Sequence, residues 1–151
     1  MLACTWAQCD DYARWIFDHF ANVRAAVSPG EFIRLLQLWI WSPAYVDSHR
    51  DDLLKVQEDF ASADLMPQHA FTAQCRACTS HDTRDQLGKI KVPTLITVGD
   101  KDIFTPPAFS EFLHAKIPGS KLEVFRGTGH AHHWEALEAF NKITTKWLLA
   151  N

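Results

Sequence analysis

Two loops of the sequence each carry a titratable side chain shortly after an apolar, β-branched segment. Asp102 comes three positions after the run 94–99, and His130 follows the run 121–125 and a Gly-Thr-Gly turn. If both runs are parallel strands, their carboxyl ends lie at the same edge of the sheet, where loops converge. We therefore expect Asp102 and His130 to be neighbours.

A carboxylate beside an imidazole has a defined chemical use. When the carboxylate accepts a hydrogen bond from one ring nitrogen, it fixes the tautomer and stabilises the imidazolium, so the other nitrogen can act as a general base. Asp100 on the same loop is an alternative partner for His130. A simpler interpretation of Asp102 is a carboxylate that caps the following helix, together with Thr105.

Metal binding is a further alternative, because His130, His132 and His133 lie within four positions and Cys75 and Cys78 form a C-x-x-C pair. No carboxylate or cysteine beside the histidines completes a zinc-ligand spacing, and the two cysteines nearer the N-terminus are wrongly spaced. An apolar helical stripe accounts for the C-x-x-C pair. We expect no metal, and we expect His132 and His133 to be exposed or to cap the last helix. A zinc-binding module is kept as one of the functional hypotheses.

Residues 10–87 have the pattern of successive amphipathic helices. Apolar side chains recur at helical spacing, and Ser-Pro pairs at 28–29 and 42–43 interrupt the pattern. A further helix is predicted to open at Pro67, since proline is favoured in the first turn. The apolar stripes are Tyr12, Trp15, Ile16, Phe20, Val23 and Val27; Phe32, Leu35, Leu36, Trp39 and Ile40; Leu53, Val56 and Phe60; and Phe71, Cys75 and Cys78.

From residue 88 the pattern becomes strand, helix, strand, helix. The runs 94–98 and 121–125 predict strands, and 133–149 predicts a closing helix, which implies parallel pairing through a right-handed crossover. Residues 1–5 are a third strand candidate. We therefore predict an α/β fold with a strand and connection at 1–9, helices at 10–87 and an α/β portion at 88–151. A strand that begins at the first residue also indicates part of a longer protein.

These segments resemble a known family. Val92-Pro93-Thr94-Leu95-Ile96-Thr97-Val98-Gly99 with Asp102 and Pro106 resembles the acid-bearing strand and loop of the α/β-hydrolase fold, and Gly127-Thr128-Gly129-His130 resembles its histidine loop. The order of acid and then histidine also agrees with the family. The stretch from Cys78 through His81-Asp82 to Val92-Pro93 resembles the return from cap to core in the 3-oxoadipate enol-lactonase and small-esterase branch.

The resemblance implies the C-terminal part of such a hydrolase, with residues 10–87 as its helical cap and the first part of the sheet absent. It assigns Asp102 as the triad acid, because its spacing from Gly99 matches the family, and His130 as the base. It implies cofactor-free hydrolysis of a small ester or lactone. Trp6, Trp39 and Trp41 then line an acyl pocket beneath the cap or simply pack in the core. Trp15, Trp134 and Trp147 are interpreted as core residues.

The sequence departs from the family in one respect. The family's nucleophile sits in a G-x-S-x-G turn, and no serine, cysteine or aspartate of this sequence has that setting. Loss of the nucleophile reduces turnover by about 10⁶ in well-studied triads. We therefore expect the chain to be inactive by itself. The alternative is a non-catalytic binding or scaffold protein derived from the hydrolase fold.

Composition limits the partners. The net charge is −3 without a basic block, and no apolar run approaches the length of a membrane span, so neither nucleic acid nor a membrane is expected as a partner. Four cysteines in a core-forming sequence favour the reduced cytoplasm. An unpaired apolar edge strand is a template for association, so we expect the chain to need its N-terminal half or a second copy of itself.

Overall fold

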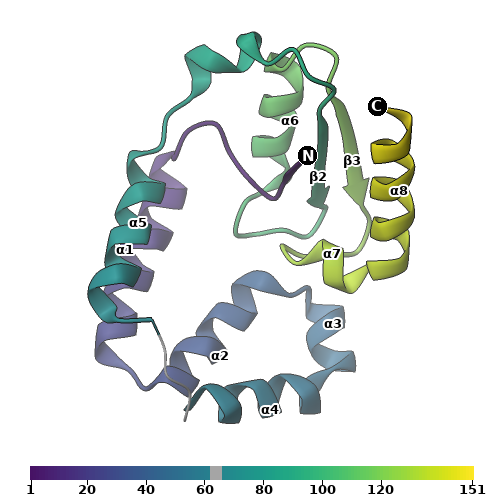
Figure 1. Ribbon diagram of the computed structural model, residues 1–151. Helices are drawn as coiled ribbons and strands as arrows, with labels where there is room; N and C mark the ends of the chain where they lie inside the picture. Colours follow the sequence, from purple (N-terminus) through teal and green to yellow (C-terminus); the bar gives the residue numbers. More distant parts are fainter. Residues whose placement is uncertain (62–65) are drawn as a thin grey trace.

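The computed structural model describes residues 1–61 and 66–151, and a parallel sheet lies at the centre of its α/β part (Figure 1). The strand order is β1-β2-β3, with β2 pairing in parallel with both neighbours. The helices α6 and α8 flank the sheet. These three parallel strands with flanking helices confirm the predicted fold class. The elements of this part are β1 (Leu2–Ala3), β2 (Leu95–Gly99), α6 (Pro107–Lys116), β3 (Lys121–Phe125), α7 (His132–Glu135) and α8 (Leu137–Ala150).

Helices make up the part of the chain between β1 and β2. α1 packs against α5, and α2 packs against α4. α2 and α3 lie on the side of the sheet to which the arrowheads of β2 and β3 point (Figure 1). α2 and α3 are therefore placed over the carboxyl ends of the strands. They are α1 (Asp11–Ala26), α2 (Pro29–Ile40), α3 (Pro43–Ser48), α4 (Arg50–Ala61), α5 (Gln68–Ser80) and the short 3₁₀ helix η1 (Arg84–Lys89).

The two Ser-Pro pairs each begin a helix. The side chain of Ser28 accepts a hydrogen bond from the N–H of Glu31 in a capping box at the start of α2. Ser42 caps α3 in the same way. In both cases the proline occupies the first turn, where its missing N–H has no helical partner to lose. The predicted interruptions are confirmed, and each is also the start signal of the next helix.

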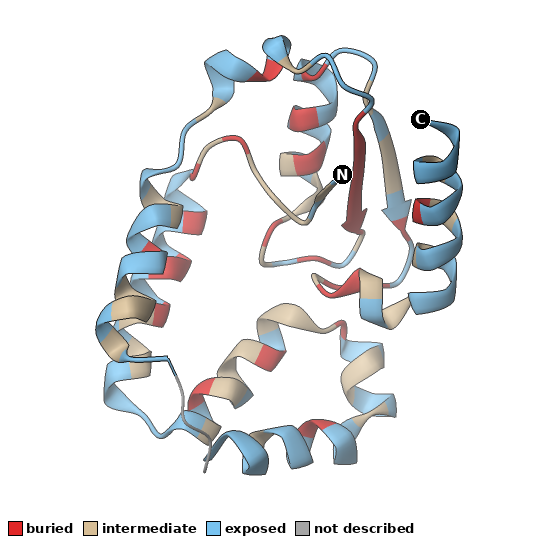
Figure 2. Ribbon diagram, in the orientation of Figure 1, coloured by how far each residue is buried: buried red, intermediate tan, exposed pale blue. Residues whose placement is uncertain are grey.

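The buried face of α1 differs from the predicted stripe. Ala13, Ile16, Phe17 and Phe20 are buried at i, i+3, i+4 and i+7 spacing, whereas Trp15 is 76% exposed. Figure 2 shows the buried positions of α1 on one side of the helix. Trp15 lies outside this face because only one side of α1 packs against other helices. Its interpretation as a core residue was wrong.

The last predicted helix is in fact two helices. α7 ends at Glu135 and α8 begins at Leu137, because Ala136 between them leaves the helical region (φ −119°, ψ 46°). Trp134 on α7 is 61% exposed, which contradicts its predicted place in the core, and Trp147 on α8 is half-buried. The break turns α7 toward the ends of the strands, beside α2 and α3 (Figure 1).

Two apolar clusters hold the elements together. β2 is buried along its whole length, as expected for an apolar strand with both faces covered, and Ile96 packs with Leu87, Leu113 and Ile117. A second cluster among the helices joins Phe20 and Phe32 to Ile16 and to partly buried aromatic side chains. Within the described residues, no helix has the length and apolar content needed to cross a bilayer.

Candidate active site

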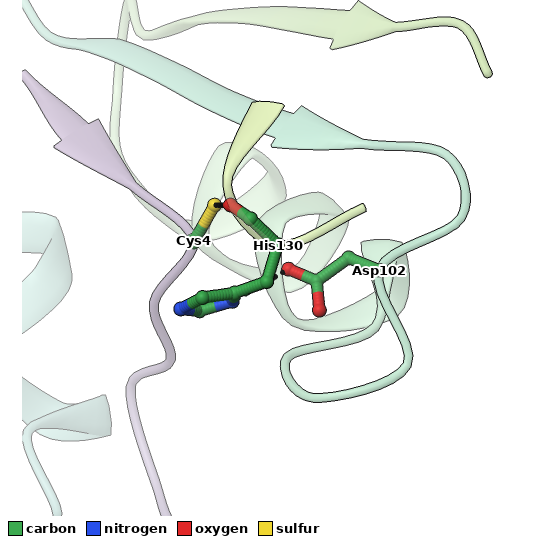
Figure 3. A group of neighbouring side chains, drawn as sticks. All are labelled: Cys4, Asp102 and His130. Carbon is green, nitrogen blue, oxygen red and sulfur yellow. Dashed lines mark hydrogen bonds and ion pairs between the residues drawn. The ribbon is translucent and has the colours of Figure 1, made fainter. Parts of the chain in front are cut away.

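Asp102 and His130 lie side by side at the carboxyl end of the sheet (Figure 3). Nδ1 of His130 is 2.9 Å from Oδ2 of Asp102. Asp102 lies on the turn after β2 and His130 on the turn after β3, so the shared edge of two parallel strands brings them together. The Asp102 side chain has no exposed surface, whereas that of His130 is 23% exposed. The predicted proximity is confirmed.

Asp102 is held by its own loop as well as by His130. Its Oδ1 accepts hydrogen bonds from the N–H groups of Phe104 (2.9 Å) and Thr105 (2.8 Å), and Oδ2 accepts one from the Thr105 hydroxyl (2.8 Å). The pairing with His130 is therefore confirmed, whereas the capping interpretation was wrong: the loop bonds of Asp102 end at Thr105, and α6 begins without a side-chain cap. Four donors fix the carboxylate, so its orientation toward the imidazole is set before any ligand arrives.

Asp100, the alternative partner, has a different place. Its Oδ1 accepts a hydrogen bond of 2.6 Å from the N–H of Gly127, and its Oδ2 lies 3.7 Å from the guanidinium of Arg126. These contacts attach the β2 turn to the start of the histidine turn. Asp100 therefore supports the geometry of the two loops, and Asp102 is the carboxylate that contacts the imidazole.

The imidazole of His130 is held at one nitrogen only. Both the Asp102 carboxylate and the Thr105 hydroxyl (3.0 Å) lie at Nδ1, and the ring of Phe104 is 4.8 Å away between centroids. Across the described ranges, no side chain or backbone group hydrogen-bonds to Nε2. With Nδ1–H donating to Asp102, Nε2 carries the free lone pair that can accept a proton.

Two glycines allow the loops to approach closely. A Cβ atom at Gly99 would lie 2.1 Å from the carbonyl oxygen of Gly129 and 2.3 Å from that of Thr128. A Cβ atom at Gly129 would lie 2.7 Å from the backbone nitrogen of Ser42. Any larger residue at either position would push the histidine turn away from its neighbours.

His132 is buried and contacts the partly buried Cys4, so the expectation that His132 is exposed was wrong. His132 has no exposed surface; its Nε2 lies 3.0 Å from the Thr97 hydroxyl and its Nδ1 lies 3.0 Å from Sγ of Cys4. The thiol of Cys4 donates to the carbonyl oxygen of His130 at 2.8 Å. Burial lowers the pKa of His132 to about 4, so this ring is neutral at pH 7.

Cys4, Asp102 and His130 are the one group of potential metal ligands found among the described residues, with ligand atoms within 4.8 Å of one another (Figure 3). Burial, followed by the charge of Asp102, raises the pKa of the Cys4 thiol. A cation would have to displace that thiol proton and the hydrogen bond between Asp102 and His130. The approach of Cys4 to His130 was not predicted, because 126 positions separate the two residues. The absence of a metal stays a prediction.

An apolar cavity of about 230 Å³ lies among α1, α2, α5 and the loop after β2. Phe104, which contacts the ring of His130, is part of its wall, so one wall residue links the cavity to the imidazole. Trp39 also lines it. Trp6 packs instead on Phe17 and Phe109, and Trp41 stacks on Tyr45, with 4.4 Å between ring centroids. The structure therefore places only one of the three predicted pocket tryptophans at this cavity. Its wall includes Phe17, Phe20, Leu36, Trp39, Phe71 and Phe104.

Comparison with known proteins gives the same fold. The chain is 35% identical over 102 residues to a 2-hydroxy-6-oxo-6-phenylhexa-2,4-dienoate hydrolase of Burkholderia cepacia, an alignment that covers 65% of the chain and 35% of that protein. It is 42% identical over 73 residues to a pimeloyl-[acyl-carrier protein] methyl ester esterase of Neisseria meningitidis, covering 48% of the chain and 27% of that protein. The chain thus spans about a third of the length of these curated relatives.

Solved structures extend the similarity to nearly the whole chain. An alpha/beta hydrolase enzyme from a Medee basin deep-sea metagenome library superposes with a TM-score of 0.89 at 22% identity, covering 97% of this chain and 54% of that one. The enol-lactonase from Burkholderia xenovorans gives a TM-score of 0.82 at 20% identity, with the same coverage of 97% and 54%. The family profile described as alpha/beta hydrolase fold matches residues 4–137. The chain therefore belongs to the alpha/beta hydrolase fold family.

Proposed function

We propose that this chain supplies the acid and the base of a hydrolase that cleaves a small ester or lactone. The observation that carries the proposal is the 2.9 Å contact between Nδ1 of His130 and Oδ2 of Asp102, with Nε2 of His130 left without a partner among the described residues. This is the arrangement that a general base needs. Hydrolase and esterase relatives support the reaction class.

In the proposed reaction His130 carries a proton in two directions. Nε2 accepts the proton of a nucleophilic hydroxyl as its oxygen attacks the substrate carbonyl, and Asp102 stabilises the imidazolium through Nδ1–H. Nε2 then donates that proton to the leaving alkoxide. A water molecule, deprotonated by the same nitrogen, then attacks the acyl-enzyme, and Nε2 returns that proton to the nucleophile oxygen as the acid is released.

The nucleophile of this proposal lies outside the chain. No described serine, threonine or cysteine side chain hydrogen-bonds to Nε2 of His130, and the sequence has no G-x-S-x-G turn. The hydroxyl and the donors that stabilise the oxyanion would come from the remainder of a longer protein. The chain by itself is therefore proposed to be inactive.

The cavity beside His130 supports an uncharged acyl group as the substrate portion bound there. Among the described residues its wall is formed by aromatic, aliphatic and cysteine side chains with Gln74 as the polar member, and none of these side chains is charged. At about 230 Å³ it lies below the usual range of roughly 300–1,000 Å³ for ligand pockets, which favours a small group. A carboxylate-bearing acyl chain would lose hydration there without a cationic partner.

The proposed partner is a set of further strands from the remainder of such a hydrolase. β1 is an edge strand, since it pairs only with β2 in the order β1-β2-β3. A cavity of about 490 Å³ lies beside it, lined by apolar side chains such as Leu2, Trp6 and Leu113 and by polar ones such as His81 and Lys89. Additional strands on this edge would pair its free backbone groups. The four free cysteines fit assembly in the reducing cytoplasm.

Labelling with a fluorophosphonate probe tests the proposal. The chain is expressed alone and, separately, in frame with the sequence encoded upstream of it. We expect labelling only of the longer protein, and we expect His130→Ala in that protein to abolish it. His19→Ala, on an exposed position of α1, is the matched control and should label normally. Light scattering of the chain alone reports its assembly, and a stable monomer would contradict the need for a partner.

A non-catalytic binding protein is the second candidate. The same unpartnered Nε2 of His130 favours it, because a base with no hydroxyl to deprotonate performs no catalysis. This candidate predicts that the longer protein also fails to label, while an apolar ester still binds at the cavity beside His130. Tryptophan fluorescence would detect that binding through Trp39 in the cavity wall.

A further inference from the structure

The backbone on both sides of His130 is attached to the junction of α2 and α3. After the histidine, the N–H of Ala131 donates to the carbonyl oxygen of Ile40 at 3.1 Å. Before it, the N–H of Gly129 donates to Oε1 of Glu135 at 3.0 Å. The same Glu135 carboxylate accepts the N–H of Ser42 at 2.9 Å on Oε1 and the hydroxyl of Ser42 at 2.6 Å on Oε2.

Little free space remains at this junction. Ser42 and Gly129 are both buried, and a Cβ atom at Gly129 would lie 2.7 Å from the nitrogen of Ser42 and 2.8 Å from the carbonyl oxygen of Ile40. The two backbone segments are therefore in direct contact. A rotation of the histidine turn would break the hydrogen bonds to Glu135 or force these atoms together.

A carboxylate is the group that this junction requires. Three donors converge on Glu135, two backbone N–H groups and one hydroxyl, and an ionised carboxylate offers acceptors only. Hydrogen bonds to an ionised acceptor are about twice as strong as neutral ones. A glutamine in its place would keep both N–H bonds on its amide oxygen, but its N–H₂ group would face the Ser42 hydroxyl, so that hydroxyl would lose its acceptor and the junction would lose the ionised carboxylate.

We propose that Glu135 is a positioning residue, which fixes the turn around His130 to the start of α3 and thereby sets the approach of the imidazole to Asp102. Its catalytic meaning rests on the proposed function, but its effect on the contact between His130 and Asp102 does not. Through Glu135 and Ser42, the placement of the helices over the sheet determines the geometry at Nδ1 of His130.

The proton on Nδ1 of His130 gives a direct test. In proton NMR spectra of the full chain, this proton is shielded from solvent by its hydrogen bond to Asp102 and is assigned by its loss in His130→Gln. In Glu135→Gln we expect its exchange with water to become at least tenfold faster or its signal to disappear. Glu138→Gln, the same change at an exposed position of the first turn of α8, should leave the rate within twofold.

Two further measurements separate positioning from loss of fold. The backbone amides of β2 should exchange at the wild-type rate in Glu135→Gln, since general destabilisation would accelerate them too. If Glu135→Gln does not fold, Ser42→Ala decides. It removes the hydroxyl donor to Glu135 and the cap that this hydroxyl gives α3, leaves both N–H bonds to Glu135, and should accelerate exchange of the Nδ1 proton by at least threefold. A Nδ1 exchange rate within twofold of wild type in a folded variant overturns the proposal, whatever the fluorophosphonate experiment shows.

Discussion

Sγ of Cys4 lies 3.0 Å from Nδ1 of His132, although 128 positions separate the two residues. Cys4 reaches this position with a left-handed backbone (φ 48°), which is rare for a residue with a side chain and costs on the order of 1 kcal/mol. Its thiol also donates to the carbonyl oxygen of His130. The end of β1 is thereby tied to the turn that carries the candidate base.

The partly buried thiol of Cys4 is predicted to react slowly in the folded chain. Burial and the charge of Asp102 raise its pKa, and only the thiolate is a nucleophile. Alkylation by iodoacetamide at pH 8, followed by peptide mass spectrometry, should be slower than in urea by a factor of about 100 or more. Equal rates in the folded and unfolded chain would contradict the described burial.

The stability of the chain is predicted to fall as the pH drops from about 6.5 to about 4. Burial lowers the pKa of His132 to about 4 from an ordinary value near 6.5. Within this window the unfolded chain binds a proton that the folded chain does not, so stability is fully present above the window and is lost progressively as the pH falls through it. The contribution of His132 is on the order of 3 kcal/mol. Urea unfolding at pH 7 and pH 4.5 measures it.

Substitution of the buried ring isolates this contribution. His132→Gln should lower the stability at pH 7, because the ring packs on Phe125 and Phe140, but it should also flatten the dependence between pH 6.5 and 4. His19→Gln, at an exposed position, should retain the wild-type slope. If His132→Gln keeps the full slope, the acid sensitivity arises from other groups.

The end of β2 is predicted not to tolerate a methyl group. In Gly99→Ala the new Cβ atom would meet two carbonyl oxygens of the histidine turn at 2.1 and 2.3 Å, so the backbone must move. We expect a loss of about 2 kcal/mol or more in the free energy of unfolding. Gly88→Ala has nothing within 4 Å of its Cβ atom and should change stability by less than about 0.5 kcal/mol. Equal effects of the two variants would contradict the close approach.

The carboxylate of Asp102 is predicted to control the tautomer of His130 in the complete enzyme. Asp102→Asn removes the charge that Nδ1–H faces at 2.9 Å, and the corresponding change in a well-studied triad lowers kcat by about 10⁴. Hydrolysis of a p-nitrophenyl ester by the longer protein measures the effect. Asp51→Asn, on a side chain that is 94% exposed, serves as the control. A loss below tenfold for Asp102→Asn would argue against the proposed base.

The sheet and the two loops were predictable because their signals are local. The runs around β2 and β3 are apolar or alternating and end in glycine-rich turns, and parallel strands place such turns at one edge. The proximity of Asp102 and His130 could therefore be predicted from the sequence. The prediction needed only the order of the elements and the direction of the strands.

The contacts that Glu135 and Cys4 make around His130 were not predictable, because they join segments that are distant in the sequence. Glu135 contacts Ser42 across 93 positions, and Cys4 reaches the histidine turn from β1. The apolar residues of α1 also fit more than one helical face, and the predicted buried face wrongly included Trp15. Nothing in the residues next to His132 indicates that its ring is buried. Whether residues 10–87 form a separate domain stays a prediction.

The three hydrogen bonds at Glu135 have a consequence for engineering. Two of them, from the N–H and the hydroxyl of Ser42, cross from the helical segment to the α/β segment, so the two segments are not independent modules at this point. A chimera that replaces residues 10–87 with helices of another hydrolase would remove Ser42 and leave Glu135 facing foreign backbone. Recombination at this boundary should succeed only when the residues at 42, 129 and 135 are inherited together from one parent.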